Sequence, residues 1–121
     1  MNAQRILSIE YNTTVLEARN AVLRSAGYEV TSAGTFYQVL ERLQENRFDL
    51  VLVGRSIPGV HLRGFMQLAQ VKAPEAKTMV LLDSPESAEP TADGSFDLTN
   101  GPEALVAAIE QLLARSKATS A

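Results

Sequence analysis

"AGYEVTSAGTFYQVLERLQENRFDLVLVG", residues 26–54, contains a complete strand–helix–strand unit. The run "DLVLV" at 49–53 is apolar after its first residue, as expected for a strand covered on both faces, and "YEVTS" at 28–32 has the pattern of a second strand. The apolar residues between them repeat with the spacing of a helix that buries one face: Phe36, Val39, Leu40 and Leu43. Thr35 with Gln38 forms a potential capping box at the start of that helix.

The same alternation continues towards the amino terminus. A strand is predicted at 5–9, and a helix follows it. Thr14 with Glu17 forms a second potential capping box, and Gly27 is expected to stop this helix because glycine tolerates the conformation that ends one. The apolar stripe of this helix comprises Val15, Ala18, Val22 and Ala26.

The alternation also continues towards the carboxyl terminus. Strands are predicted at 78–83 and 95–98. A weaker helical stripe ends before Pro74 and comprises Phe65, Leu68, Ala69 and Lys72. Pro102 suits the first position of a last helix, whose stripe comprises Leu105, Ala108, Ile109, Leu112 and Leu113.

Five strands that alternate with helices over short connections predict an α/β fold. Right-handed crossovers place the helices on both faces of a parallel sheet, so we expect a single-domain three-layer αβα sandwich. The predicted domain covers residues 1–116, and residues 117–121 are expected to form a polar C-terminal tail. Periodicity alone leaves the order of the strands open.

Composition excludes several classes of function. The formal net charge is −3 and the basic residues are scattered, which argues against nucleic-acid binding and against a basic membrane anchor. Cysteine is absent and His61 is the single histidine, so no cysteine or histidine metal cluster is expected. No apolar run approaches the length of a membrane span and no signal peptide is evident, so we expect a soluble cytoplasmic protein without a metal or cofactor.

With these elements in place, the chain resembles the receiver domain of two-component response regulators, a flavodoxin-like signalling module. The segment 26–54 matches the family's second strand, second helix and third strand in spacing and character, and "IPG" at 57–59 stands in the loop after the third strand. "GPEALVAAIEQLL" at 101–113 resembles the last helix. The resemblance implies a five-stranded parallel sheet of order 2-1-3-4-5 and a site at the carboxyl ends of its strands.

The family accepts a phosphoryl group on an aspartate, with help from an acidic pair that holds a divalent cation, a hydroxyl group and a lysine. The resemblance places Gly54 at the phosphoacceptor position, where a carboxylate is required. Glu10 remains from the acidic pair, but its neighbour is Tyr11. Asp83 stands at the hydroxyl position, where its charge would repel a phosphoryl group.

The lysine position falls on Leu98 or Thr99, depending on a one-residue difference in register. Neither register supplies a lysine, because none occurs between Lys77 and Lys117. The four departures at one site together predict a pseudo-receiver, a domain that keeps the receiver fold but cannot accept a phosphoryl group.

Two structural expectations follow from these departures. Tyr11 is expected to lean into the space beside Gly54, while Arg55 pairs with Glu10 or Asp83 and so closes the crevice. The family's fourth helix is expected to be shortened or missing, because only "SPESAEPTADGS" separates Asp83 from Phe96 and a proline inside a helix costs about 3 kcal/mol.

The leading functional hypothesis is a signalling module that binds a protein partner without phosphorylation. The alternative is a sensor that binds a small molecule or nucleotide in the crevice near Glu10, Tyr11, Arg55 and Asp83. An enzyme is disfavoured, because Ser56 and Ser84 lack a histidine at a plausible spacing and His61 is expected to be a solvated loop residue. A homodimer is possible through the small residues Ala107, Ala108 and Ala114 of the last helix.

Overall fold

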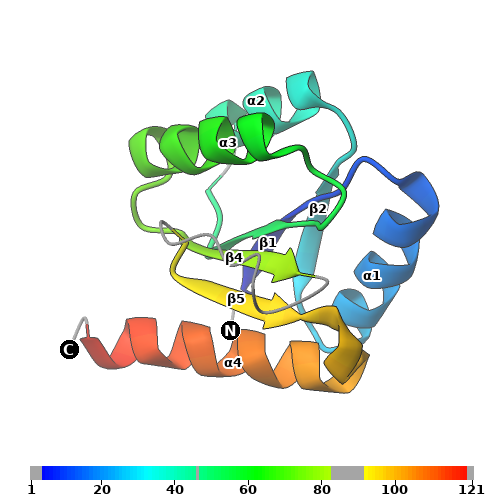
Figure 1. The fold of residues 1–121 in the computed structure, drawn as a ribbon. Coiled ribbons are helices and arrows are strands. Elements are labelled where there is room, and N and C mark those ends of the chain that lie inside the picture. The colour runs from blue at the N-terminus through cyan, green and yellow to red at the C-terminus, as the bar shows by residue number, and fades with distance from the viewer. Residues whose placement is uncertain (1–3, 46, 83–91, 120–121) are drawn as a thin grey trace.

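The computed structural model describes residues 4–45, 47–82 and 92–119 and has the predicted alternation of strands and helices (Figure 1). The amino-terminal half contains β1 (Arg5–Ile9), α1 (Thr13–Ser25), β2 (Glu29–Ala33), α2 (Phe36–Glu45) and β3 (Leu50–Val53). The carboxyl-terminal half contains α3 (Gly59–Lys72), β4 (Lys77–Leu82), β5 (Gly94–Asp97), the 3-10 turn η2 (Leu98–Asn100) and α4 (Pro102–Thr119).

The five strands form one parallel sheet of order β2-β1-β3-β4-β5, which confirms the order that the family resemblance implies. The register aligns Ile9 with both Ala33 and Val53, so the carboxyl ends of the three strands lie level with one another. The chain leaves β1 for β2 on one side and leaves β2 for β3 on the other. This switch point lies between β1 and β3, where ligands bind in sheets of this kind.

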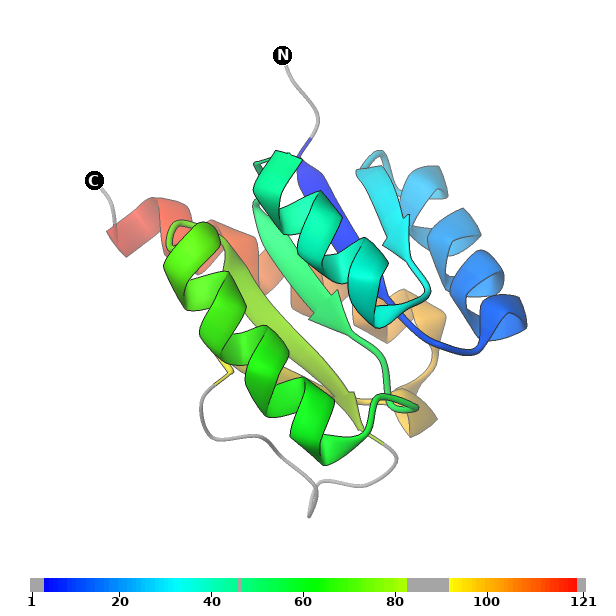
Figure 2. The ribbon, with the colours of Figure 1, turned by 90° about the horizontal axis from the view of Figure 1, so that it is seen from above.

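Helices cover both faces of the sheet. Figures 1 and 2 show α2 and α3 side by side on one face and α1 and α4 on the other. The core under α2 and α3 includes Val39, Leu43, Phe65 and residues of every central strand. The core on the opposite face includes Leu23, Ile109 and Leu112. Both faces of β3 are fully buried, which explains its continuous apolar run.

The helix ends agree only in part with the predicted caps. Asn12, not Thr14, caps α1, because its side-chain oxygen accepts a hydrogen bond of 3.2 Å from the backbone N–H of Val15. At α2 the Thr35 hydroxyl accepts from the N–H of Gln38 at 3.2 Å, as predicted. Gly27 has a φ of +98°, which is the left-handed conformation expected where it ends α1.

The buried face of α1 differs from the predicted stripe. The residues that α1 buries are Leu16, Arg19, Asn20 and Leu23. Val15 and Val22 are only half-buried and Ala18 and Ala26 are exposed, so the predicted stripe faces away from the sheet. In α2, by contrast, Val39 and Leu43 of the predicted stripe are buried.

Some predicted boundaries shift or fall outside the description. Strands β2 to β5 begin or end one residue away from the predicted ranges. Helix α4 continues to Thr119 and so extends into the stretch 117–121 that was predicted as a polar tail. The shortened or missing fourth helix was predicted for residues 84–95, of which 84–91 lie outside the described residues. Among the described helices, none is both long and apolar enough to cross a membrane.

Candidate functional site

The ends of β1 and β3 bring two of the predicted site residues together. Glu10 follows β1 directly and Gly54 follows β3 directly. The N–H of Gly54 donates a hydrogen bond of 2.7 Å to the carbonyl oxygen of Ile9, and the N–H of Glu10 donates to Ala33 at 3.2 Å. These bonds extend the sheet ladder beyond the strands and hold the backbones of Glu10 and Gly54 side by side.

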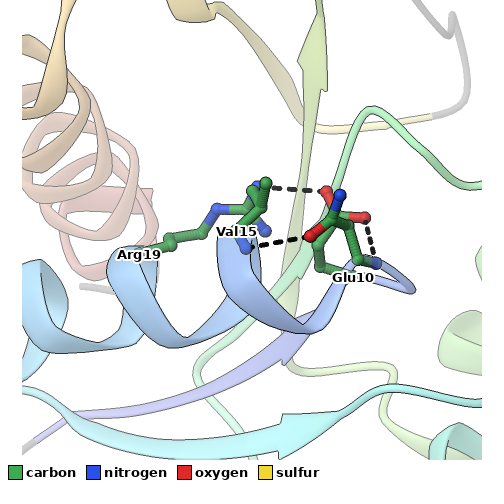
Figure 3. A network of polar contacts seen from close by, with 4 residues as sticks. Glu10, Val15 and Arg19 are labelled. Atoms are coloured by element: carbon green, nitrogen blue, oxygen red, sulfur yellow. Dashed lines mark hydrogen bonds and ion pairs between the residues drawn. The ribbon is translucent and has the colours of Figure 1, made fainter.

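Glu10 is buried although it carries a charge, with 1% of its surface exposed. One carboxylate oxygen accepts a hydrogen bond of 3.2 Å from the backbone N–H of Asn12. The other forms an ion pair of 3.3 Å with the guanidinium group of Arg19, which reaches it from α1 (Figure 3). A buried carboxylate requires such partners, because burial of an unpaired charge is very costly.

The Glu10 side chain fills the space beside Gly54. A Cβ atom added at Gly54 would lie 2.8 Å from Cδ of Glu10 and 2.9 Å from the carbonyl oxygen of Ile9, and still closer to Oε1 of Glu10. Carbon atoms in folded proteins do not approach so closely without a shift of their neighbours. Gly54 is therefore the residue that makes room for the Glu10 carboxylate.

Tyr11 does not fill this space, contrary to the prediction. Its hydroxyl group instead lies 2.9 Å from Nδ1 of His61 at the start of α3, and the two rings meet edge to face. His61 is half-buried and packs near Phe36 and Phe65, so it is not the solvated loop residue that the sequence suggested. Partial burial raises the pKa of Tyr11, which keeps its hydroxyl group protonated as a hydrogen-bonding group.

Arg19 was not among the predicted site residues, yet it supplies the charge that balances Glu10. Its side chain is 5% exposed. Burial lowers the pKa of Arg19, the Glu10 carboxylate opposes this shift, and the positive charge of Arg55 adds to it. Its Nη1 atom has no hydrogen-bond partner within the described structure. A signal was present in the sequence, because Leu16 and Leu23 stand three residues before and four after Arg19 and place it on a buried face.

The remaining predicted positions are only partly described. Asp83 lies outside the described residues. Leu98 and Thr99 begin the turn η2 after β5, and Asp97 accepts hydrogen bonds from the Thr99 N–H at 2.9 Å and from its hydroxyl group at 2.7 Å. These two hydrogen bonds lower the pKa of Asp97. Thr99 is therefore engaged within the turn, while Leu98 packs against the core beneath α4.

A small cavity of about 160 Å³ opens at this end of the sheet. Its lining residues are Glu10, Asn12, Val15, Arg55 and Ser56. Arg55 is exposed and stands at the cavity wall. In the described part of the chain, no three acidic or histidine side chains gather as metal ligands would. A divalent cation prefers several oxygen ligands, so one carboxylate already paired with a guanidinium group does not fit such an ion.

The family-model comparison and the structure comparison agree with each other. The model of the response regulator receiver domain matches residues 6–99. A CheY-like receiver domain of Methanospirillum hungatei is 21% identical, with a TM-score of 0.84 over 98% of this chain and 99% of that one. A chemotaxis response regulator of Vibrio cholerae is 20% identical, with a TM-score of 0.78 over 92% and 99% of the two chains. The search of curated proteins found no match.

A further similar structure is a response regulator of Thermotoga maritima in complex with Mg²⁺ and BeF. It is 20% identical, with a TM-score of 0.78 over 90% of this chain and 98% of that one. At these identities the solved structures establish the fold of this chain. Its chemistry must be inferred from its own residues.

Proposed function

The chain belongs to the response regulator receiver family, and from that premise we propose that it is a receiver domain that cannot accept a phosphoryl group. It acts by binding a protein partner without phosphorylation, within bacterial signal transduction in the cytoplasm. Catalysis is disfavoured, because the Glu10 carboxylate is buried against Arg19.

The observation that carries this proposal is the contact between Glu10 and Gly54. Phosphorylation of a receiver needs a carboxylate at the end of the third strand, and Gly54 has no side chain to offer. The space that such a side chain needs is occupied by Glu10. Glu10 is the nearest described carboxylate, but it is buried and its two oxygens are engaged by Asn12 and Arg19, which disfavours its use as a nucleophile.

Among the described residues, the cation that supports phosphoryl transfer in this family finds no suitable site. Arg19 already supplies a positive charge to Glu10 at 3.3 Å. Tyr11, which stands beside Glu10 in the sequence, is turned towards His61. The described residues therefore favour a permanently neutralised acidic crevice over one that takes up Mg²⁺.

Exposed apolar side chains at the starts of α2 and α3 support protein contact. Tyr37 at the start of α2 is 76% exposed and Val60 at the start of α3 is 71% exposed. Phe36 is also exposed, and its ring lies 5.4 Å from that of His61, which joins the two helix starts. We call Phe36, Tyr37 and Val60 the apolar edge. Such clusters on a domain surface often mark interaction sites.

The crevice itself gives little support to the alternative of a small-molecule sensor. Its cavity of about 160 Å³ is smaller than the roughly 300–1,000 Å³ of typical ligand sites.

Intact-mass spectrometry after incubation with acetyl phosphate and Mg²⁺ tests the chemical half of the proposal. The expected result is an unchanged mass, while a receiver domain with an intact aspartate, treated in parallel, gains one phosphoryl group. A phosphoryl gain on this chain, mapped to any carboxylate, would overturn the proposal.

Capture of partners from a native lysate tests the binding half. The full chain is expected to retain the same partner with and without acetyl phosphate. Tyr37→Ser should weaken this capture, whereas Val71→Ser should not, because Val71 is equally exposed but lies at the other end of α3. Capture that appears only with the phosphodonor would contradict the proposal.

A further inference from the structure

Strand β2 forms one edge of the sheet, and its neighbour in the sheet order is β1. The N–H of Glu29 and the carbonyl oxygen of Ala33 form hydrogen bonds of 3.0 and 3.2 Å with the chain at the two ends of β1. Because the backbone groups of successive strand residues point to opposite sides, Val30 and Ser32 direct their N–H and C=O groups away from the sheet. Such an edge is a template on which a further strand can pair.

Two arginines contact the outward carbonyl groups of this edge. A guanidinium nitrogen of Arg24, in the last turn of α1, donates to the carbonyl oxygen of Val30 at 3.2 Å. The Nε–H of Arg42, in the last turn of α2, donates to the carbonyl oxygen of Ser32 at 3.5 Å. Helices α1 and α2 lie on opposite faces of the sheet (Figure 1), so one arginine reaches the edge from each face. Together they engage both outward acceptors of β2.

The residues of β2 itself give the edge little protection against pairing. Its sequence, EVTSA, has β-branched residues at the second and third positions and contains neither proline nor lysine. The register with β1 runs without interruption from Glu29 to Ala33, so no β-bulge twists the edge away. Glu29 is the only charged side chain among these five residues, and it forms an ion pair of 3.6 Å with Arg5 on β1. Protection of this edge therefore depends on side chains from outside the strand.

We propose that Arg24 and Arg42 keep this edge from pairing with the same edge of a second copy of the chain. Two copies related by a two-fold axis would meet antiparallel, with Val30 of one opposite Ser32 of the other. Residues paired in this way exchange both of their N–H···O=C hydrogen bonds. The arginines oppose this pairing because they engage the carbonyl oxygens that the other copy needs, and because like charges from both copies would meet at the seam. The inference does not depend on the loss of phosphorylation, so it goes beyond the proposed function.

The double variant Arg24→Met, Arg42→Met tests this role, because methionine keeps an unbranched stem and removes the donors and the charge. The variant is expected to self-associate at least about tenfold more strongly than the natural chain in sedimentation velocity. Hydrogen exchange followed by ¹H–¹⁵N NMR should then be slower at the N–H groups of Val30 and Ser32 than in the natural chain. Sedimentation identical to that of the natural chain, or association without this slower exchange, would overturn the proposal.

Two further variants separate edge pairing from a general gain in apolar surface. Arg47→Met, Arg63→Met makes the same chemical change at two exposed arginines, one before β3 and one in α3, and should sediment as the natural chain does. Ser32→Pro, added to the first double variant, removes an N–H that faces away from β1 and should therefore reverse the association. Association of the control variant, or association that survives Ser32→Pro, would refute pairing through β2.

A measurement on the natural chain tests the contact itself and needs no substitution, so it decides the question even where the double variant does not fold. The Nε–H of Arg42 should exchange with water more slowly than that of the exposed Arg63, because it is hydrogen-bonded to the carbonyl oxygen of Ser32. Equal exchange rates at the two side chains would overturn the proposal.

Discussion

Helices α1 and α2 lie on opposite faces of the same sheet and follow their predicted patterns to different degrees (Figure 1). In α2 the buried residues, Val39 and Leu43, both belong to the predicted stripe, while Leu40 is half-buried and Phe36 is exposed. In α1 the helix is turned so that Arg19 and Asn20 are buried between Leu16 and Leu23. The predicted stripe of α1 then lines a groove beside α4.

The difference shows how one buried charge can decide which face of a helix packs inward. Glu10 is held in the interior by the backbone at the end of β1, and its carboxylate needs a cation. Arg19 meets that need only if its own face of α1 turns towards the sheet. The residues that helix α2 buries are the apolar Val39 and Leu43, so no buried charge competes with them for the inward face.

The largest expected effect is the loss of the Arg19 charge. Arg19→Met should lower the free energy of unfolding by about 3–5 kcal/mol, because Glu10 is then buried without its ion-pair partner. Urea denaturation followed by circular dichroism measures this loss.

The double variant Glu10→Leu, Arg19→Met is the control for this prediction. Replacement of both charges by apolar groups of similar size is often nearly neutral, so much of the lost stability should return. A single variant as stable as the natural chain would show that Arg19 does not orient α1.

The second prediction compares the two helices directly. Val39→Ala in α2 should lower the free energy of unfolding by about 2–4 kcal/mol, because it removes two methyl groups from a fully buried site. The same change at Val22 of α1 should cost less than about 0.5 kcal/mol, because Val22 borders the groove and alanine favours the helix. Equal losses in thermal or urea unfolding would mean that the α1 stripe is part of the core.

The third prediction concerns the space that Glu10 occupies. Gly54→Ala should destabilise the protein by about 1–3 kcal/mol, because the added methyl group meets the Glu10 carboxyl group and the Ile9 carbonyl oxygen. Gly64→Ala within α3 is the matched control, since nothing lies within 4 Å of its added Cβ. It should stabilise the protein by about 0.5–1 kcal/mol in the same denaturation assay. A stabilising Gly54→Ala would exclude Glu10 as the group that fills this space.

The smallest effect is expected at Asp97, in the turn that leads from β5 to the groove. Hydrogen bonds from Thr99 lower its pKa below the usual 3.8, so its contribution to stability is present above that pH. This contribution is lost as the pH falls through the lowered pKa. Asp97→Asn keeps a capping oxygen and should therefore show less acid sensitivity between neutral pH and pH 3, read from urea midpoints. An unchanged pH profile would contradict a lowered pKa at this position.

The fold could be predicted from the sequence because most elements show their own spacing of apolar residues and end at a recognisable residue. The continuous run before Gly54, the stripe of α2 and the glycine after α1 are all local signals, and the structure contains each of them. The adjacency of Glu10 and Gly54 was also predictable, because parallel strands end at one edge.

The partners of the site residues were not predictable in the same way. Arg19 and His61 reach Glu10 and Tyr11 from other elements, α1 and α3. The spacing of Leu16 and Leu23 could have placed Arg19 on a buried face, but it does not specify which group the Arg19 side chain meets. Four apolar residues at helical spacing made the wrong face of α1 look like the buried one. The buried charge of Glu10 at the end of β1 favours the opposite face, because Arg19 lies on it.

The close fit between Glu10 and Gly54 makes the altered crevice difficult to reverse by single steps. An aspartate introduced at position 54 alone would clash with the Glu10 side chain. Removal of Glu10 alone would leave the buried Arg19 charge without its ion-pair partner. A lineage that carries this arrangement would need coordinated changes at three positions before any of them restored a phosphoacceptor. Each of the three residues Glu10, Arg19 and Gly54 therefore makes a change at the other two more costly in stability.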